Sequence, residues 1–159
     1  MPSEPVKSLH AALAAMTFTV ETGEFVLIGF PEPPVQADLE CLGSPPAQLV
    51  RERDETTLLL SAGRAAEVLA RHPGARVERD LAWIRFEAPM AWELVGFLAL
   101  VTGELARAGV PIGAVCGFRR DHLFLARRHL ATARETLERL LSNGDSRAGL
   151  GLTATDPGA

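Results

Sequence analysis

Four polar residues that could do chemistry stand in a row at Arg119, Arg120, Asp121 and His122, with apolar stretches on both sides. Aspartate and histidine serve as general acids, general bases and metal ligands, so this cluster is the first candidate for catalysis. Neighbouring side chains on a strand point to opposite faces, however, which keeps Asp121 and His122 from acting on one substrate. We therefore interpret the four residues as a polar turn and the start of a strand. The edge of a ligand site is the alternative, and a catalytic or metal centre ranks last.

The two cysteines add no covalent or redox chemistry. Cys41 and Cys116 lie far apart and no CxxC pair is present, which argues against a disulfide framework or a zinc site. Cys116 has no histidine at an evident partner position, so it is not predicted to be a nucleophile. The stretch GVPIG lacks the lysine and the hydroxyl residue of a phosphate-binding loop. We expect no cofactor, no metal ion and no catalytic residue.

The composition is that of an ordinary globular protein. Of 159 residues, 47% are hydrophobic and 23% are charged, which is enough apolar material for a substantial core. The net charge of −4 gives no sign of the basic face of a nucleic-acid binder. No apolar run approaches the roughly 18 residues of a membrane span. The start, VKSLHAALAAM, favours a short amphipathic helix over a signal peptide. We expect a cytoplasmic protein that binds neither nucleic acid nor a membrane.

The first half of the chain mixes helices with short strands. Apolar residues at helical spacing predict a helix over residues 5–15. Two apolar runs on either side of a turn at Gly23 predict a β-hairpin over residues 18–30. Strands are predicted at 47–52 and 57–61, with a charged bend between them and a short helix after them.

The second half predicts the order strand, helix, strand, strand, helix. The strand at 75–87 leads into a long helix at 91–109, whose apolar residues form one stripe and whose end carries a glycine. Strands follow at 110–118 and 122–126, and a final helix occupies 129–144.

This order of elements predicts an α+β fold with mostly antiparallel sheets and helices packed on one face. The two halves suggest two modules, at residues 1–74 and 75–144. The segment 145–159 is small, polar and glycine-containing, and its composition predicts a flexible tail.

Two stretches carry a resemblance to a known family. The stretch WIRFEAPMAWELVGFLALVTGELARAGVPIGAVCGFRRDHLFL, residues 83–125, resembles small bacterial proteins built from ACT-type domains, which are similar to the regulatory modules of aspartate kinases. RERDETTLLL, residues 51–60, looks like the acidic turn that precedes a Thr-Leu strand in that family. The match covers roughly residues 9–141. It implies two ferredoxin-like (ACT-type) βαβ modules, no catalysis, an amino-acid ligand between modules, and a homodimer.

A ligand site is predicted where the long helix starts, at residues 93–96. The first amides of a helix lack internal partners and, with the helix dipole, favour a carboxylate. Gly96 has no Cβ and allows a ligand to approach the backbone, although it could equally serve close packing of the helix on the sheet. The end of the facing strand and the charged bend could supply further contacts. The candidate ligand-binding residues are Trp92, Glu93, Leu94, Val95, Gly96, Val115, Cys116, Gly117, Asp54, Glu55, Asp121 and His122.

The sequence therefore predicts a non-catalytic regulatory protein that binds a small molecule, expected to be an amino acid. The alternative is a ligand-free module for protein–protein interaction or dimerisation. That alternative draws on two departures from the family: Met90, Ala91 and Trp92 stand where small hydroxyl residues often precede the helix, and Gly113 stands where asparagine is usual.

Overall fold

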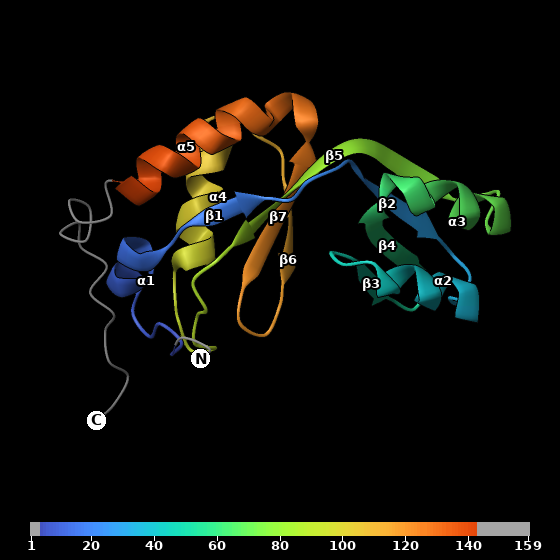
Figure 1. Ribbon diagram of the computed structural model, residues 1–159, viewed down its shortest axis with the longest axis horizontal. Helices are drawn as coiled ribbons and strands as arrows, with labels where there is room; N and C mark the ends of the chain where they lie inside the picture. The colour runs from blue at the N-terminus through green and yellow to red at the C-terminus, as the bar shows by residue number, and fades with distance from the viewer. Residues whose placement is uncertain (1–3, 143–159) are drawn as a thin grey trace.

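A single curled sheet runs through residues 4–142, the part of the chain that the computed structural model describes (Figure 1). Its strands follow the order β3-β4-β2-β5-β7-β6, every pair is antiparallel, and β1 is added on β5. The strands are β1 (Phe18–Val20), β2 (Phe25–Phe30), β3 (Gln48–Arg51), β4 (Thr56–Ser61), β5 (Arg76–Phe86), β6 (Gly113–Cys116) and β7 (Asp121–Ala126). The α-helices are α1 (Leu9–Ala15), α2 (Gln36–Glu40), α3 (Ala65–Arg71), α4 (Phe97–Arg107) and α5 (Leu130–Ser142).

The expected order of elements in the second half is confirmed: β5, α4, β6, β7 and α5 follow one another as predicted. Short 3₁₀ turns precede α3 and α5 and follow α2. Between residues 4 and 142, none of the helices is long and apolar enough to span a membrane. The predicted tail at 145–159 lies outside the described residues.

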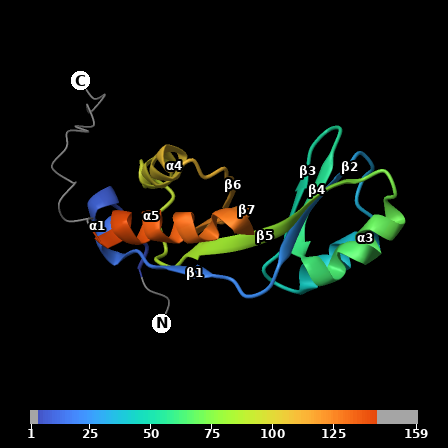
Figure 2. The same cartoon turned by 90° about the horizontal axis from the view of Figure 1, so that it is seen from above.

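β5 joins the two halves of the molecule. It has 11 residues and pairs with β2 through its first part, and with β7 and β1 through its second part. A β-bulge separates the two parts, and Asp80 within it adopts a left-handed conformation with φ 55°. Such a bulge bends and twists a strand. The separate sheets expected from the sequence are therefore one continuous sheet, and β5 is the strand that runs through both halves of the molecule (Figure 2).

The predicted hairpin over residues 18–30 is wrong. β1 and β2 do not pair with each other; both pair with β5, Phe18 opposite Phe86 and Phe25 opposite Leu81. They run in the same direction along one side of β5, so the turn at Gly23 connects two collinear segments. The sequence signal misled because a glycine between two apolar runs fits a hairpin and an interrupted edge strand equally well.

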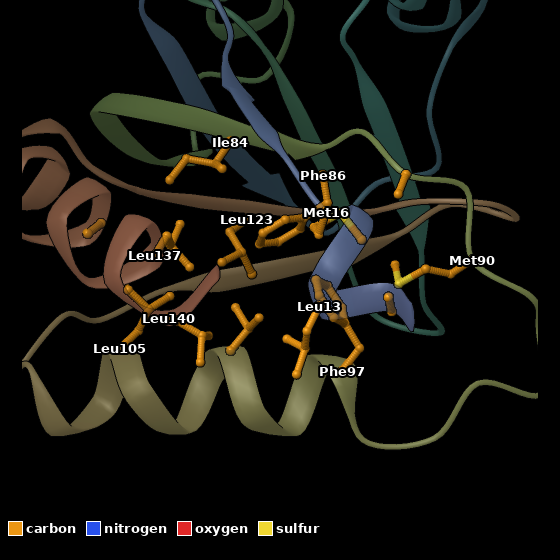
Figure 3. Packing of buried hydrophobic residues seen from close by; sticks show 14 of the residues in the cluster. Leu13, Met16, Ile84, Phe86, Met90, Phe97, Leu105, Leu123, Leu137 and Leu140 are labelled. Carbon is orange, nitrogen blue, oxygen red and sulfur yellow. The ribbon is translucent and has the colours of Figure 1, made fainter. Parts of the chain in front are cut away.

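Two helix-packed cores lie at the two ends of the sheet. In the larger one, α1, α4 and α5 cover the second part of β5 together with β7 (Figure 3). In the smaller one, α2 and α3 cover β2 and β4. The strand residues of both cores alternate with those of a third, helix-free cluster built on Phe25, Leu59, Leu81 and Trp83. Helices therefore cover one face of the sheet and leave the other open, as the sequence predicted. The helix α1, from the first half of the chain, packs in the core of the second.

A buried charge network fixes α2 against α3. Asp38 has no exposed surface, and its Oδ2 accepts a hydrogen bond from the Val35 amide at 2.9 Å and lies 3.0 Å from His72 Nε2. Its Oδ1 accepts two hydrogen bonds from Arg71, at 2.9 and 2.8 Å. The Phe30 ring stacks on His72 with 3.6 Å between ring centres. The network thus ties both helices of the smaller core to the end of β2.

We predict that Asp38→Ala lowers the free energy of unfolding by about 3 kcal/mol in urea denaturation. The substitution leaves the Arg71 guanidinium and the His72 ring without their buried partner, and breaking such a pair costs roughly 3–5 kcal/mol. The low end applies because the Arg71 side chain is 27% exposed. A matched control is Glu67→Ala, which breaks an exposed ion pair with Arg64 and should cost no more than about 0.5 kcal/mol. Equal losses in both variants would contradict a structural role for the network.

The same network predicts a loss of stability in acid. Burial raises the pKa of the Asp38 carboxyl, but the Val35 amide, Arg71 and His72 outweigh it and hold the pKa below the ordinary value of 3.8. A depressed carboxyl pKa stabilises the folded state above the unfolded-state pKa, and this contribution is lost as the pH falls through the folded-state pKa. The difference in unfolding free energy between wild type and Asp38→Asn should therefore be constant from pH 7 to about 4 and shrink below it. If the difference in unfolding free energy between wild type and Asp38→Asn increased below pH 4, the pKa of Asp38 would not be lowered in the folded state.

Candidate functional site

The long helix of the second half begins later than the sequence indicates. α4 starts at Phe97, and its N-cap Gly96 adopts a left-handed conformation with φ 95°. Of residues 93–96, which were predicted to form the helix start, only Gly96 lies there, as the N-cap, and the prediction is wrong for residues 93–95. The segment before Gly96 turns instead, and the Leu94 amide donates to the Ala91 carbonyl at 3.1 Å. Gly96 is required by its backbone angle, and a Cβ there would also come within 3.3 Å of Leu9.

A cavity of about 230 Å³ opens in front of this helix start. We call it the helix-start cavity; it is lined by residues 90–92, Leu94, 96–99 and 116–121. It brings together six of the candidate ligand-binding residues, which come from the segment before α4, the end of β6 and the start of β7: Trp92, Leu94, Gly96, Cys116, Gly117 and Asp121. Glu93 and Val95 do not line it, and Val95 is 83% exposed. Val115 packs on the helix-free face instead.

Backbone hydrogen bonds fix both walls of the helix-start cavity. The Met90 amide donates to the Arg119 carbonyl at 2.8 Å, which ties the segment after β5 to the loop between β6 and β7. That loop is closed by the Gly117 amide, which donates to the Arg120 carbonyl at 2.8 Å. On the other side, the Ala91 amide donates to the Val6 carbonyl at 2.9 Å. The cavity is therefore positioned by three separate parts of the chain.

The polar quartet that opened the sequence analysis is a turn and a strand start, as predicted. Arg119 and Arg120 lie in the loop, and β7 begins at Asp121. Asp121 pairs with Cys116 in the sheet and His122 pairs with Val115, so the Asp and His side chains point to opposite faces. Within residues 4–142 there is no group of three His, Cys, Asp or Glu side chains that could hold a metal ion.

At the helix-start cavity, the protonated thiol of Cys116 pairs with the carboxylate of Asp121. Cys116 is exposed as a residue, but local desolvation of its thiol, and then the neighbouring Asp121, raise the pKa of the thiol above its ordinary value of 9.0. The thiol therefore keeps its proton at neutral pH and donates a hydrogen bond toward Asp121. A protonated thiol is a poor nucleophile.

His122 faces a second cavity, of about 510 Å³, on the helix-free face of the sheet. We call it the sheet-face cavity; it is lined by Glu21, residues 45–46, Arg85, 117–120 and His122. The His122 Nδ1 accepts a hydrogen bond from Trp83 Nε1 at 3.1 Å. Burial, and then the charge of Arg85, hold the His122 pKa below its usual value of 6.5. The ring is therefore neutral at physiological pH.

The charged bend between β3 and β4 stands apart from both cavities. Glu55 lines a different hollow, of about 490 Å³, where it pairs with Arg76 and lies against Gly29. Asp54 is exposed at the bend itself. The structure does not bring either carboxylate to the helix start, because β2 and β5 separate β4 from β7 in the sheet.

Several lining residues were not among the sequence candidates. The helix-start cavity also uses Phe97 and Leu98 together with Arg119 and Arg120. The two arginines belong to the polar quartet of the sequence analysis but were not among the candidate ligand-binding residues, and their placement depends on the curl of the loop. Arg85 also had a signal, as a charged residue within the apolar second part of β5.

The fold is shared with regulatory parts of aspartate kinases. The protein Atu0741 from Agobacterium tumefaciens matches with a TM-score of 0.66 and 18% identity, over 87% of this chain and 90% of that chain. A Vibrio cholerae protein of unknown function matches with a TM-score of 0.64 and 22% identity, over 84% and 95%. The regulatory subunit of aspartate kinase from Thermus thermophilus matches with a TM-score of 0.54 and 16% identity, over 79% and 97%.

At these identities the likenesses concern the fold alone. They confirm the fold-level part of the resemblance seen in the sequence, because regulatory subunits of aspartate kinase are among the similar chains and are covered almost completely. No protein-family model matches the chain, and no curated protein matches its sequence.

The pair at the helix-start cavity predicts slow alkylation of Cys116. Because its pKa is raised, Cys116 should react with iodoacetamide at about pH 8 more slowly than an unperturbed cysteine, since only the thiolate attacks. Asp121→Asn removes the carboxylate charge and should speed the reaction, as mass spectrometry of the labelled peptide will report. Buried Cys41 gives an internal control that stays unlabelled in the folded protein. A slower reaction in Asp121→Asn would disprove the electrostatic coupling of the two groups.

Proposed function

We propose that this protein is a non-catalytic, ACT-type regulatory protein that binds a free amino acid in the helix-start cavity. The observation that carries the proposal is the meeting, in one cavity, of a helix N-terminus, two arginines and a carboxylate. Its fold, shared with regulatory subunits of aspartate kinase, supports a regulatory role. The volume of about 230 Å³ suits a ligand smaller than the drug-sized molecules that occupy roughly 300–1,000 Å³.

The lining matches the two charged ends of an amino acid. The amides of residues 97–99 at the start of α4 have no partners within the helix, and the dipole favours a carboxylate there. Arg119 and Arg120 add positive charge on the facing side. Asp121 offers a carboxylate for the ligand's ammonium group. Met90 and Leu98 supply apolar surface for the ligand side chain.

Regulation requires that the ligand favour one packing arrangement over another. The helix-start cavity has walls from different parts of the chain, the segment before α4 and the loop between β6 and β7. A ligand that bridges them holds α4 against the sheet edge. We propose two interlocked ACT-like modules, at 1–74 and 75–144, in which α1 of the first packs on α4 and α5 of the second.

The second candidate function is a ligand-free interaction or dimerisation module. It is favoured by three large apolar side chains that stand exposed at or beside the helix-start cavity: Trp92 is 77% exposed, Val95 83% and Phe118 81%. Exposed aromatic residues are enriched at protein interfaces. Both candidates are compatible with a homodimer in which a second copy covers this rim.

We predict that one or a few of the twenty amino acids, at millimolar concentration, raise the midpoint of thermal unfolding. A ligand at about 100 times its dissociation constant stabilises the folded state by roughly 2.7 kcal/mol, which is a shift of several degrees for a chain of this size. Asp121→Asn removes the charge that faces the ammonium group and should weaken the affinity at least about tenfold. Asp54→Asn is the matched control, because Asp54 is exposed and outside the cavity.

Two outcomes would contradict the amino-acid site. The first is no shift with any amino acid, and the second is an equal loss of affinity in Asp121→Asn and Asp54→Asn. In the first case, a dimer that dissociates in sedimentation velocity on Trp92→Ser would favour the interaction module instead.

A further inference from the structure

The sheet-face cavity concentrates positive charge in a protein that is acidic overall. Three arginines and one carboxylate, Glu21, line it, whereas the chain as a whole carries a net charge of −4. A cleft lined mainly by cations raises the local concentration of small anions. The volume of about 510 Å³ is that of a small-molecule site.

The arginines at this cavity keep hydrogen-bonding capacity to spare. Arg120 donates from Nε to the Glu87 carbonyl at 2.9 Å, and Arg85 lies 3.6 Å from the Glu87 carboxylate. Each guanidinium has five N–H donors, so most of them remain for a ligand. Arg119 has no ion pair with any residue between 4 and 142. The planar fork of arginine matches carboxylate and phosphate oxygens.

His122 adds a neutral donor with a fixed tautomer. An indole N–H can only donate, so the bond from Trp83 makes His122 Nδ1 the acceptor. The neutral ring therefore carries its proton on Nε2. This nitrogen lies near the loop between β6 and β7: an ideal Cβ built on Gly117 would be 3.9 Å from it. Gly117 and His122 both line the sheet-face cavity, so the Nε2–H is available to an occupant.

We propose that the sheet-face cavity binds a small dianion, a molecule carrying a phosphate group or two carboxylates, which Arg85, Arg119 and His122 contact together. Two guanidiniums neutralise the two negative charges, and the His122 Nε2–H completes the contact with a neutral donor. This site shares Arg119 with the proposed amino-acid site. It is distinguished from that site by its position on the opposite face of the sheet and by Arg85 and His122, which do not line the helix-start cavity.

The two tryptophans allow each site to be read independently. The chain has only Trp83 and Trp92. The Trp83 indole donates to His122 and so senses the sheet-face cavity, whereas Trp92 lines the helix-start cavity. A ¹⁵N–¹H correlation spectrum therefore contains one indole signal for each site. If the amino-acid proposal is wrong, the Trp92 indole signal will not respond to amino acids, whereas the response of the Trp83 signal to dianions can still be measured.

The experiment titrates the full chain with inorganic phosphate and, separately, with succinate, against sodium chloride at matched ionic strength. We expect the Trp83 indole signal to move saturably with at least one dianion and to move little with chloride. A response to phosphate alone identifies a phosphorylated small molecule as the ligand class, and a response to succinate alone identifies a dicarboxylate. A Trp83 signal that moves no more with either dianion than with chloride overturns the proposal.

Variants locate the site. Arg85→Gln should raise the apparent dissociation constant of the responding dianion at least about tenfold, because Arg85 lines only this cavity of the two. Arg128→Gln is the matched control: Arg128 is exposed and outside both cavities, so its titration should equal that of wild type. If Arg85→Gln fails to fold, Arg119→Gln takes its place with the same expectation. Equal dissociation constants in the cavity variant and Arg128→Gln would refute the assignment.

Discussion

The rest of the structure depends on one long strand that pairs with different neighbours along its length. β5 binds β2 through its first part and β1 and β7 through its second, with a bulge between the two. An extra residue in a strand changes which face its side chains point to, so Val77 faces the smaller helix-packed core while Leu81 and Trp83 face the open side. Without this change, the apolar residues in one of the two parts of β5 would point away from the helices that cover that part.

The same strand decides where the two cavities can form. The segment directly after β5 forms one wall of the helix-start cavity and is hydrogen-bonded to the loop between β6 and β7. Arg85 and Trp83 project from β5 to the helix-free face, where one lines the sheet-face cavity and the other fixes the tautomer of His122. Both sites are therefore consequences of how the second part of β5 pairs with β7, and neither belongs to a single helix or loop.

The sequence determines the second half well because its signals are local. The apolar stripe predicts α4, the polar break predicts the turn before β7, and alternation separates Asp121 from His122. The first half was predicted less well because its pairing is non-local. Nothing near Gly23 indicates that β1 and β2 share β5 as a neighbour, since Phe25 and Leu81 are far apart in the sequence.

The candidate site was predictable in part: residues near local sequence signals were placed correctly, and residues whose position depends on non-local pairing were not. The residues of the loop and of the helix start are close in sequence to strong signals, and most of them meet in one cavity. Glu55 was assigned to the site on the expectation that two modules face each other. In the continuous sheet, β2 and β5 lie between β4 and β7, so Glu55 is kept away from β7 and pairs with Arg76. Local sequence preferences predict where a turn occurs, but the order of the strands in the sheet determines which residues lie next to that turn.

The loop at residues 117–120 lines both cavities, and this gives the fold a means of linking them. The loop is short, and backbone hydrogen bonds tie it to itself and to Met90, in the segment that leads into α4. A ligand that draws Arg119 toward one face of the sheet removes its charge from the other. Any such effect on affinity is reciprocal, because the coupling free energy between two sites is the same in both directions. If both proposed ligands bind, they compete for Arg119 and Arg120, since one pair of arginines cannot neutralise anions on both faces at once.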